Sequence, residues 1–174
     1  KFFDYSKDGK ITSDDKMILG SGEPLFTGGF GFRADVKSFS VNTIFQFSYG
    51  SKIFNANLAT LDAGRDAYNQ TRHLLDAWIP ALYNSEGVLV DAGNPSGQYR
   101  MPGGGPENYL LSSFLEDGSF LRFSDLTVAY TFPKKWTVPF KIEGIKLFAT
   151  AKNIFVLTNY YGFDPEVNTR QGGI

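Results

Sequence analysis

The feature that most restricts the fold of this chain is a two-residue alternation of apolar and polar side chains. In residues 26–36, apolar or small side chains occupy the even positions, and in residues 39–49 mostly apolar side chains occupy the odd positions. Only Ile44 interrupts the polar series of the second stretch. Successive side chains of a β-strand point to opposite faces of a sheet, so the pattern predicts two strands with one apolar face each.

Two more strands are predicted in the last third of the chain. Alternation returns at Ser119 and continues to Pro133, which ends the strand because proline cannot donate to a β-ladder. A further alternating stretch covers residues 145–152. Between the two strand pairs, residues 51–118 show no regular alternation, and a short helix is predicted around residues 68–78.

The lengths of the connections separate two interpretations of these strands. The connections at Ser38 and at residues 133–144 are short, whereas residues 51–118 are a long connection. Short turns at one end and long loops at the other are typical of outer-membrane barrels, whose strands need roughly 9–11 residues to span the bilayer. A soluble β-sandwich with one solvated face per sheet explains the alternation almost as well. Four strands cannot close a barrel, so the barrel interpretation implies a larger polypeptide.

Composition excludes several classes of function. The chain has 174 residues and no cysteine, so disulfides, thiolate metal sites and cysteine nucleophiles are ruled out. Its 17 basic and 18 acidic residues give a net charge of −1, which does not indicate nucleic-acid binding. It has no apolar run long enough for a transmembrane helix and does not open with a signal peptide. Aromatic residues make up 16% of the chain, which suits strands better than a helical core.

The Asp-rich segment at residues 4–15 has the register of a twelve-residue calcium loop. Such loops draw oxygen ligands from positions 1, 3, 5, 7, 9 and 12, with glycine at position 6, which is Gly9 here, and an apolar residue at position 8, which is Ile11. The shorter Asp15 replaces the usual glutamate, so the segment is closer to dockerin-type loops than to paired EF-hands. An Asp/Gly-rich turn without metal is the alternative. The predicted Ca²⁺ ligands are Asp4, Ser6, Asp8, the Lys10 carbonyl, Thr12 through water, and Asp15.

No group of residues predicts catalysis. His73 is the single histidine and has no nucleophile or carboxylate pattern beside it, so an ordinary loop role is expected. Glu116 and Asp117 read as turn residues at a strand entrance, and residues 103–105 lack the Lys-Ser/Thr of a phosphate loop. The aromatic residues of the long loop could bind sugars or peptides, but packing is the favoured role. They are Tyr68, Trp78, Tyr83 and Tyr99.

Several short blocks of distinctive sequence follow one another along the chain. An Asp-rich DGKI segment leads to a Leu-Gly pair and then to a strand beginning Pro-Leu-Phe-Thr-Gly-Gly-Phe. The most specific blocks are Leu-Glu-Asp-Gly-Ser-Phe-Leu-Arg, Ala-Tyr-Thr-Phe-Pro, Ala-Lys-Asn-Ile-Phe and Gly-Phe-Asp-Pro-Glu. The stretches lie at residues 4–20, 24–30, 45–50, 115–122, 129–133, 151–155, 158–160 and 162–166. In this order they resemble the end of the barrel in the SusC/RagA family of TonB-linked outer-membrane proteins.

The resemblance implies an all-β fold, namely about four late strands of a large transmembrane antiparallel barrel with long extracellular loops. It further implies TonB-dependent import of an oligosaccharide or peptide across the outer membrane of a Gram-negative, Bacteroidetes-type cell, without enzymatic activity. The implied partners are a SusD-like surface lipoprotein, outer-membrane lipid, the glycan or peptide substrate, and TonB through an N-terminal part that this chain lacks. A soluble, calcium-stabilised β-sandwich that binds carbohydrate is the alternative.

On this interpretation the chain has five parts, and a final strand ending in an aromatic residue is expected beyond Ile174. The parts are an extracellular loop with the calcium-type motif (1–22), a strand pair (23–50), a long extracellular loop (51–118), a second strand pair (119–156), and a loop before the missing strand (157–174).

Overall fold

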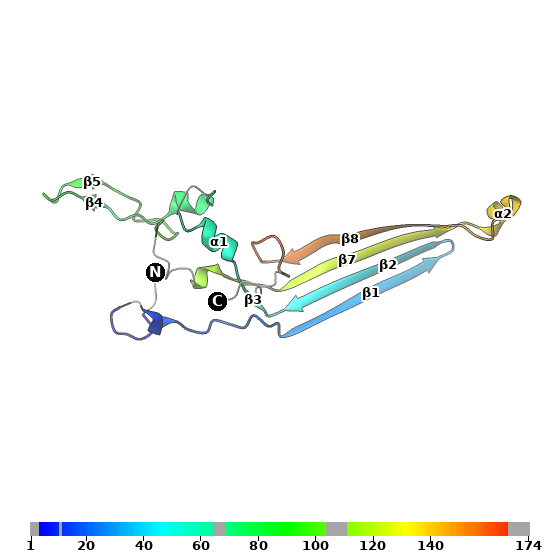
Figure 1. The fold of residues 1–174 in the computed structure, drawn as a ribbon, viewed down its shortest axis with the longest axis horizontal. Coiled ribbons are helices and arrows are strands. Elements are labelled where there is room, and N and C mark those ends of the chain that lie inside the picture. Colours follow the sequence, from blue (N-terminus) through cyan, green and yellow to red (C-terminus); the bar gives the residue numbers. More distant parts are fainter. Residues whose placement is uncertain (1–3, 11, 65–68, 104–110, 167–174) are drawn as a thin grey trace.

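A four-stranded antiparallel sheet dominates the computed structural model, which describes residues 4–10, 12–64, 69–103 and 111–166 (Figure 1). Its strands lie in the order β1-β2-β7-β8. All four are long, as the alternation predicts, and the last continues past its predicted end at residue 152. The strands are β1 (Phe26–Val36), β2 (Phe39–Tyr49), β7 (Phe120–Thr131) and β8 (Lys146–Thr158).

The register of the strands brings the apolar side chains of all four onto one face. A row of four phenylalanines crosses the sheet, since Phe30 pairs with Phe45, Phe45 with Phe123, and Phe123 with Phe155. The rings of Phe30 and Phe45 stack 5.0 Å apart, and those of Phe45 and Phe123 stack 4.5 Å apart. Directly opposed side chains in antiparallel strands share a face, so this row defines an apolar face of the sheet.

Polar side chains line the other face. Asn42 pairs with Thr127, and Thr127 pairs with Thr150, with 3.0 Å between the two threonine hydroxyls. Gln46 pairs with Arg122 in the same way. The sheet therefore has one apolar face and one mainly polar face, on which Ile44, Phe120, Phe148 and Val156 are the large apolar exceptions.

The apolar face is exposed. Phe32 and Leu147 are each 65% exposed, at opposite edges of the sheet. A soluble sandwich would cover this face with a second sheet, but the described residues form only two further sheets, each a pair of strands of two or three residues. An apolar face of this size needs a cover of lipid or protein. None of the helices described is long and apolar enough to cross a bilayer.

Two β-bulges interrupt the pairing of β7. Between Ile44 and Phe45 of β2, the facing strand has one surplus residue, Ser124. Opposite Ser124, β8 has two unpaired residues, of which Asn153 has a φ of 50°. The bulge changes the phase of β7, so that Phe123 and Leu126 point to the same face.

The long connection between β2 and β7 is folded, not extended. Its first and last segments pair with each other as β3 and β6, and a short hairpin, β4–β5, projects away from the rest in Figure 1. The helix predicted around residues 68–78 is only a short 3-10 helix, and Tyr68 lies outside the described residues. The elements are β3 (Lys52–Phe54), α1 (Ala56–Leu61), η2 (Arg72–Asp76), β4 (Leu82–Tyr83), β5 (Leu89–Asp91), η4 (Ser112–Phe114) and β6 (Leu115–Asp117).

The α-helix of this connection, α1, lies outside the range predicted for a helix and begins after an N-cap residue, Asn55. The Asn55 side chain accepts a hydrogen bond from the Leu58 backbone N–H at 2.9 Å, which satisfies one of the free donors at a helix start. We call the end of the sheet at this connection the loop end. The opposite end, with the β1–β2 turn and the β7–β8 connection, is the turn end. The remaining elements are η1 (Ser13–Asp15) near the N-terminus and α2 (Lys134–Thr137) and η5 (Val138–Phe140) in the β7–β8 connection.

The left-handed backbone of Asn153 allows a test of the bulge. Asn153→Val should lower the free energy of unfolding by about 1–2 kcal/mol, because a β-branched residue resists positive φ. Asn153→Gly should leave it nearly unchanged, since glycine adopts this conformation freely. The comparison is made by urea unfolding of the whole folded protein. Equal stability of the two variants would contradict the bulge geometry.

Candidate functional site

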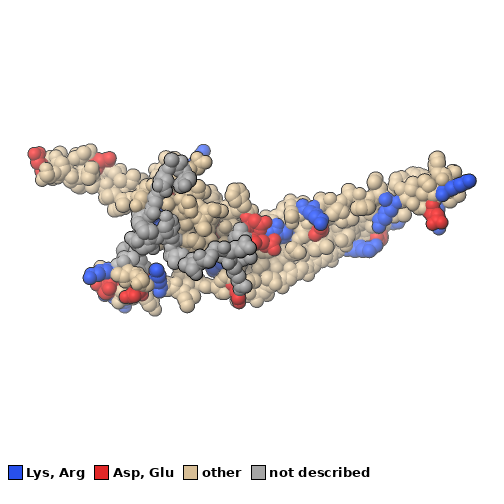
Figure 2. All heavy atoms as spheres, viewed as in Figure 1, with Lys and Arg blue, Asp and Glu red and all other residues tan. Residues whose placement is uncertain are grey.

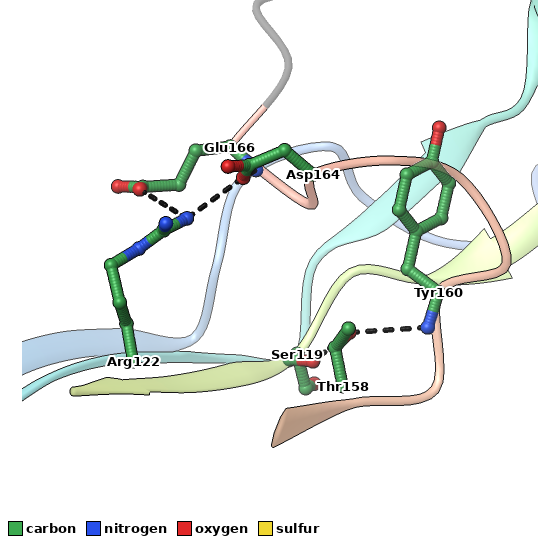
Figure 3. Close-up of polar contacts among 6 residues, drawn as sticks. All are labelled: Ser119, Arg122, Thr158, Tyr160, Asp164 and Glu166. Carbon is green, nitrogen blue, oxygen red and sulfur yellow. Dashed lines mark hydrogen bonds and ion pairs between the residues drawn. The ribbon is translucent and has the colours of Figure 1, made fainter. Parts of the chain in front are cut away.

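A buried arginine on the polar face holds the segment that follows β8. The Arg122 side chain is 7% exposed, and its Nη2 lies 2.8 Å from Asp164 Oδ1 and 2.7 Å from Glu166 Oε2. Figure 3 shows the guanidinium rising from β7 to meet both carboxylates. The guanidinium carbon also lies 5.5 Å from the ring centroid of Phe120. Arg122 therefore fixes the end of residues 159–166 above the sheet.

The electrostatics of this contact favour the ionised carboxylate. Burial by itself would raise the pKa of Asp164, but hydrogen bonds from the Glu166 backbone and from Arg122, with the Arg122 charge, hold that pKa below its ordinary value. Within the described residues, two buried polar atoms of β7 have no hydrogen-bond partner, namely Arg122 Nε and Ser124 Oγ. The polar face thus has unused hydrogen-bonding capacity next to the ion pairs.

Hydrogen bonds of the Ser119 and Thr158 hydroxyls join the ends of β2, β7 and β8 at the loop end. The Thr158 hydroxyl donates to the Ser119 carbonyl at 2.8 Å and accepts from the Tyr160 N–H at 3.1 Å. The Ser119 hydroxyl donates to Asp117 at 2.7 Å and accepts from the Gly50 N–H at 3.0 Å. Hydrogen bonds from the Ser119 side chain and backbone lower the pKa of Asp117. The ends of β2, β7 and β8 are therefore tied to one another.

Glu116 links three segments that are far apart in sequence. Its Oε1 accepts a hydrogen bond from Asn55 Nδ2 at 2.8 Å, and its Oε2 accepts one from the Tyr161 N–H at 2.6 Å. Asn55 is the N-cap of α1, so Glu116 orients the start of the long connection. The side chain of Tyr160 is buried beside this junction, and its burial, followed by the Glu116 charge, raises its pKa.

The residues just described form a junction at the loop end, made of Asn55, Glu116, Asp117, Ser119, Arg122, Thr158, Tyr160, Asp164 and Glu166. Three of the sequence stretches singled out above, residues 115–122, 158–160 and 162–166, meet in it. Glu116 and Asp117, predicted to be turn residues, lie in strand β6, where Glu116 makes contacts distant in sequence and Asp117 accepts hydrogen bonds from Ser119. The roles of Arg122, Asp164 and Glu166 were missed, although an arginine on the polar face of a strand with an acidic pair downstream was a usable signal.

A second polar cluster orders the long connection. Asp62 lies 3.0 Å from His73 Nδ1 and also accepts a hydrogen bond from the Thr71 hydroxyl. The His73 ring stacks on Tyr99 with 4.2 Å between centroids and an interplanar angle of 8°. His73 and Tyr99 thus have packing roles. Trp78 and Tyr83 remain largely exposed.

The predicted calcium ligands lie together in one small loop, but their carboxylates hold backbone groups. Asp4 Oδ2 accepts from the Gly9 N–H at 2.8 Å, and Asp8 Oδ1 accepts from the Lys10 N–H at 2.8 Å. The Asp15 carboxylate accepts from the backbones of Ser6 and Thr12, which lowers its pKa.

No three acidic, histidine or cysteine side chains in the described ranges are placed to hold a metal ion. Ile11 is outside those ranges. The calcium site stays a prediction.

Removal of the Arg122 cation tests its role at the junction. Arg122→Met should accelerate amide hydrogen exchange in residues 159–166 about tenfold or more, since hydrogen bonds to charged groups contribute about 1.5–3 kcal/mol each. Arg33→Met is the matched control, because the Arg33–Asp35 pair is exposed and worth about 0–1 kcal/mol. Unchanged exchange in Arg122→Met would contradict the anchoring role.

The lowered pKa of Asp164 gives the anchor a defined pH dependence. A depressed folded-state pKa stabilises the attachment above the unfolded value of 3.8, and the stabilisation is lost as pH falls through the folded value. Exchange in residues 159–166, corrected for intrinsic rates, should therefore stay slow from pH 7 to pH 4 and rise below it. Asp164→Asn should flatten this dependence. Release of the segment between pH 7 and pH 5 would be inconsistent with the ion pair.

Comparison of sequences relates the chain to outer-membrane receptors. No family model matches it. It is 31% identical over 169 residues to TonB-dependent receptor P3 of Formosa agariphila, a match that covers 97% of this chain and 15% of that protein. TonB-dependent receptor SusC of Bacteroides thetaiotaomicron is 36% identical over 66 residues, or 37% of this chain and 7% of that protein. The chain thus spans a small part of its curated relatives.

Comparison with solved structures also relates the chain to outer-membrane transporters. The RagAB peptide transporter matches with a TM-score of 0.67 and 26% identity over 90% of this chain and 16% of that chain. The RagAB peptide importer in its open-open state also gives a TM-score of 0.67. The ordered blocks, the four-stranded sheet with one apolar face and these likenesses agree, and the chain belongs to the SusC/RagA family of TonB-dependent outer-membrane proteins as a part of their β-barrel.

Proposed function

We propose that this chain supplies four strands to the barrel of an importer in the outer membrane of a Gram-negative, Bacteroidetes-type cell. The continuous apolar face of β1, β2, β7 and β8 is the observation that carries the proposal, because lipid is the cover that such a face requires. The polar face then lines the barrel interior. A carbohydrate-binding sandwich is not favoured, since its second sheet has no counterpart in the described residues.

The asymmetry of the connections orients the strands. In outer-membrane barrels the long loops face the outside and the short turns face the periplasm. The loop end, with its junction, is therefore extracellular, and the turn end is periplasmic. Arg122 and Glu116 then brace the extracellular mouth of the barrel against the segments that extend above it.

The cargo is an oligosaccharide or a peptide, moved by binding and gated passage without covalent chemistry. Support comes from the relatives, which are TonB-dependent receptors and a structure named as a peptide transporter. Energy would come from TonB through parts of the protein outside this chain.

The partner at the extracellular side is a SusD-like surface lipoprotein. The β4–β5 hairpin supports this role, because it projects from the loop end and keeps apolar side chains exposed, among them Leu82 at 59% and Val90 at 63% (Figure 1). Exposed apolar side chains on a projecting hairpin are suited to an interface. The hairpin is the proposed contact with the lipoprotein.

Membrane fractionation of cells that express the whole protein tests the first proposal. The protein should be extracted from outer membranes by detergent and should change its gel mobility on heating, as folded barrels do. Deletion of its gene should abolish growth on the oligosaccharide or peptide that it imports. Recovery of a stable soluble monomer would overturn the assignment.

The lipoprotein contact is tested by a double variant of the hairpin. Leu82→Ser with Val90→Ser should reduce co-purification of the lipoprotein at least about tenfold, because buried interface anchors cost more than 1 kcal/mol each when truncated. Leu75→Ser is the control, since Leu75 is 85% exposed on η2 outside the hairpin. Equal recovery from both variants would remove the hairpin from the interface.

We also propose that residues 4–15 bind Ca²⁺. Asp4, Asp8 and Asp15 lie in the same loop, and a carboxylate oxygen that accepts one N–H keeps a lone pair for a cation. Asp4, Ser6, Asp8, the Lys10 carbonyl, Thr12 and Asp15 would provide the oxygens. The ion would stabilise this extracellular loop and take no part in transport chemistry.

Calcium binding is measured by protease resistance of the loop with added Ca²⁺ and with chelator. Ca²⁺ should slow cleavage severalfold, and Asp4→Asn or Asp15→Asn should remove the effect. Asp14→Asn should retain it, because Asp14 lies outside the ligand register. Identical cleavage with Ca²⁺ and with chelator in the native sequence would exclude the site.

A further inference from the structure

The turn end of the sheet is strongly basic. Figure 2 shows Lys and Arg side chains gathered toward that end, with acidic side chains between them. The β7–β8 connection, residues 133–144, has three lysines and one acidic residue, Glu143. The lysines near this end are Lys37 in the β1–β2 turn, Lys134, Lys135 and Lys141 in the connection, and Lys146 at the start of β8.

The three lysines of the connection are available to a partner. Lys134, Lys135 and Lys141 are exposed, and among the described residues none has a carboxylate within ion-pair distance. Three ammonium groups on one short connection repel one another unless anions lie nearby. The fold thus presents an unneutralised cationic surface at this end.

Large apolar side chains stand among these lysines. Trp136 is 54% exposed, Val138 64% and Phe140 75%. Amphipathic aromatic rings next to lysines are the composition of a membrane–water interface, where the rings lie at the level of the headgroups. A surface that only faced periplasmic water would not need these apolar side chains.

An unbroken row of rings joins the connection to the apolar face of the sheet. Phe39 packs on Tyr130 with 4.7 Å between centroids, Tyr130 on Phe132 with 5.0 Å, and Phe132 on Trp136 with 6.2 Å. Phe39 and Tyr130 are a cross-strand pair on the apolar face. The connection therefore continues the surface that the proposed function assigns to lipid.

The connection is a fixed structure. Thr137 is 1% exposed, and its hydroxyl donates to the Lys134 carbonyl at 3.2 Å. Lys141 adopts a left-handed φ of 58° and donates its N–H to the Val138 carbonyl at 2.9 Å. The backbone that carries its lysines and rings is thereby ordered on one short segment, so less backbone freedom is lost on binding.

We propose that the β7–β8 connection is a membrane anchor that binds anionic phospholipid headgroups at the periplasmic surface of the bilayer. Trp136, Val138 and Phe140 insert at the headgroup level, and Lys134, Lys135 and Lys141 contact the phosphates. Charge complementarity and continuity with the apolar face select this occupant. The inference rests on the proposed barrel, because only a membrane-spanning sheet brings the turn end to a lipid surface.

Quenching of Trp136 fluorescence by brominated lipids tests the anchor. The whole protein is reconstituted in vesicles that contain brominated phosphatidylglycerol or brominated phosphatidylcholine, and Trp136→Phe supplies the signal to subtract. Phosphatidylglycerol should be preferred about fivefold or more at Trp136, since a lysine near an anionic surface contributes about this factor. Lys134→Gln, Lys135→Gln and Lys141→Gln together should bring the preference to about one.

The matched control replaces three exposed lysines away from the turn end, Lys7, Lys16 and Lys52, by glutamine, and it should keep the preference. A barrel that shifts on gels but shows equal quenching by both lipids overturns the headgroup contact. A shifted barrel without any quenching of Trp136 overturns the anchor and points to an acidic protein as the occupant. Failure to insert into vesicles would overturn the proposed barrel itself.

Discussion

The separation of apolar and polar side chains onto two faces of one sheet is the constraint on which the rest of this structure depends. The row Phe30, Phe45, Phe123 and Phe155 shows how strictly the register maintains it, because each ring meets the next across a strand pair. Aromatic pairs of this kind contribute about 0.5–1.5 kcal/mol each beyond the area that they bury. A shift of any strand by one residue along its neighbour would move all of its apolar side chains to the polar face of the sheet.

At the loop end, the structure is stabilised mainly by hydrogen bonds and ion pairs. Backbone groups that leave a sheet lose their ladder partners and must find others. The Ser119 and Thr158 hydroxyls and the Glu116 carboxylate supply such partners for Gly50, Tyr160 and Tyr161. Arg122, which lies within β7, adds ion pairs to Asp164 and Glu166, the acidic residues that follow β8. The loop end of the sheet is thus held by a network whose members come from three separate stretches of sequence, residues 50–55, 116–122 and 158–166.

Much of this fold follows from the sequence. Alternation alone predicts β1 and β2 with the bounds that the structure gives. The extent of β8 was underestimated because Asn153 interrupts its ladder, and the phase change at Ser124 hides the common face of Phe123 and Leu126. The short α-helix α1 was not predicted, because its start depends on the Asn55 cap and on the contact of Asn55 with Glu116 across 61 residues. Local patterns do not encode long-range partners such as Arg122 and Glu166. The sequence blocks identified the stretches that meet at the junction, but they did not predict which residues contact one another.

The paired bulges restrict how the sheet can be assembled. β7 has one residue more than β2 over the same length, and β8 has one more than β7. A regular strand could slide by two residues along its neighbour and still keep its apolar side chains on the same side. Here such a slide would separate each surplus residue from the gap opposite it and would place the left-handed Asn153 in an ordinary ladder. The backbone itself thus allows only one alignment of these strands. A strand that joins an open edge of the sheet must match this alignment before its side chains have packed.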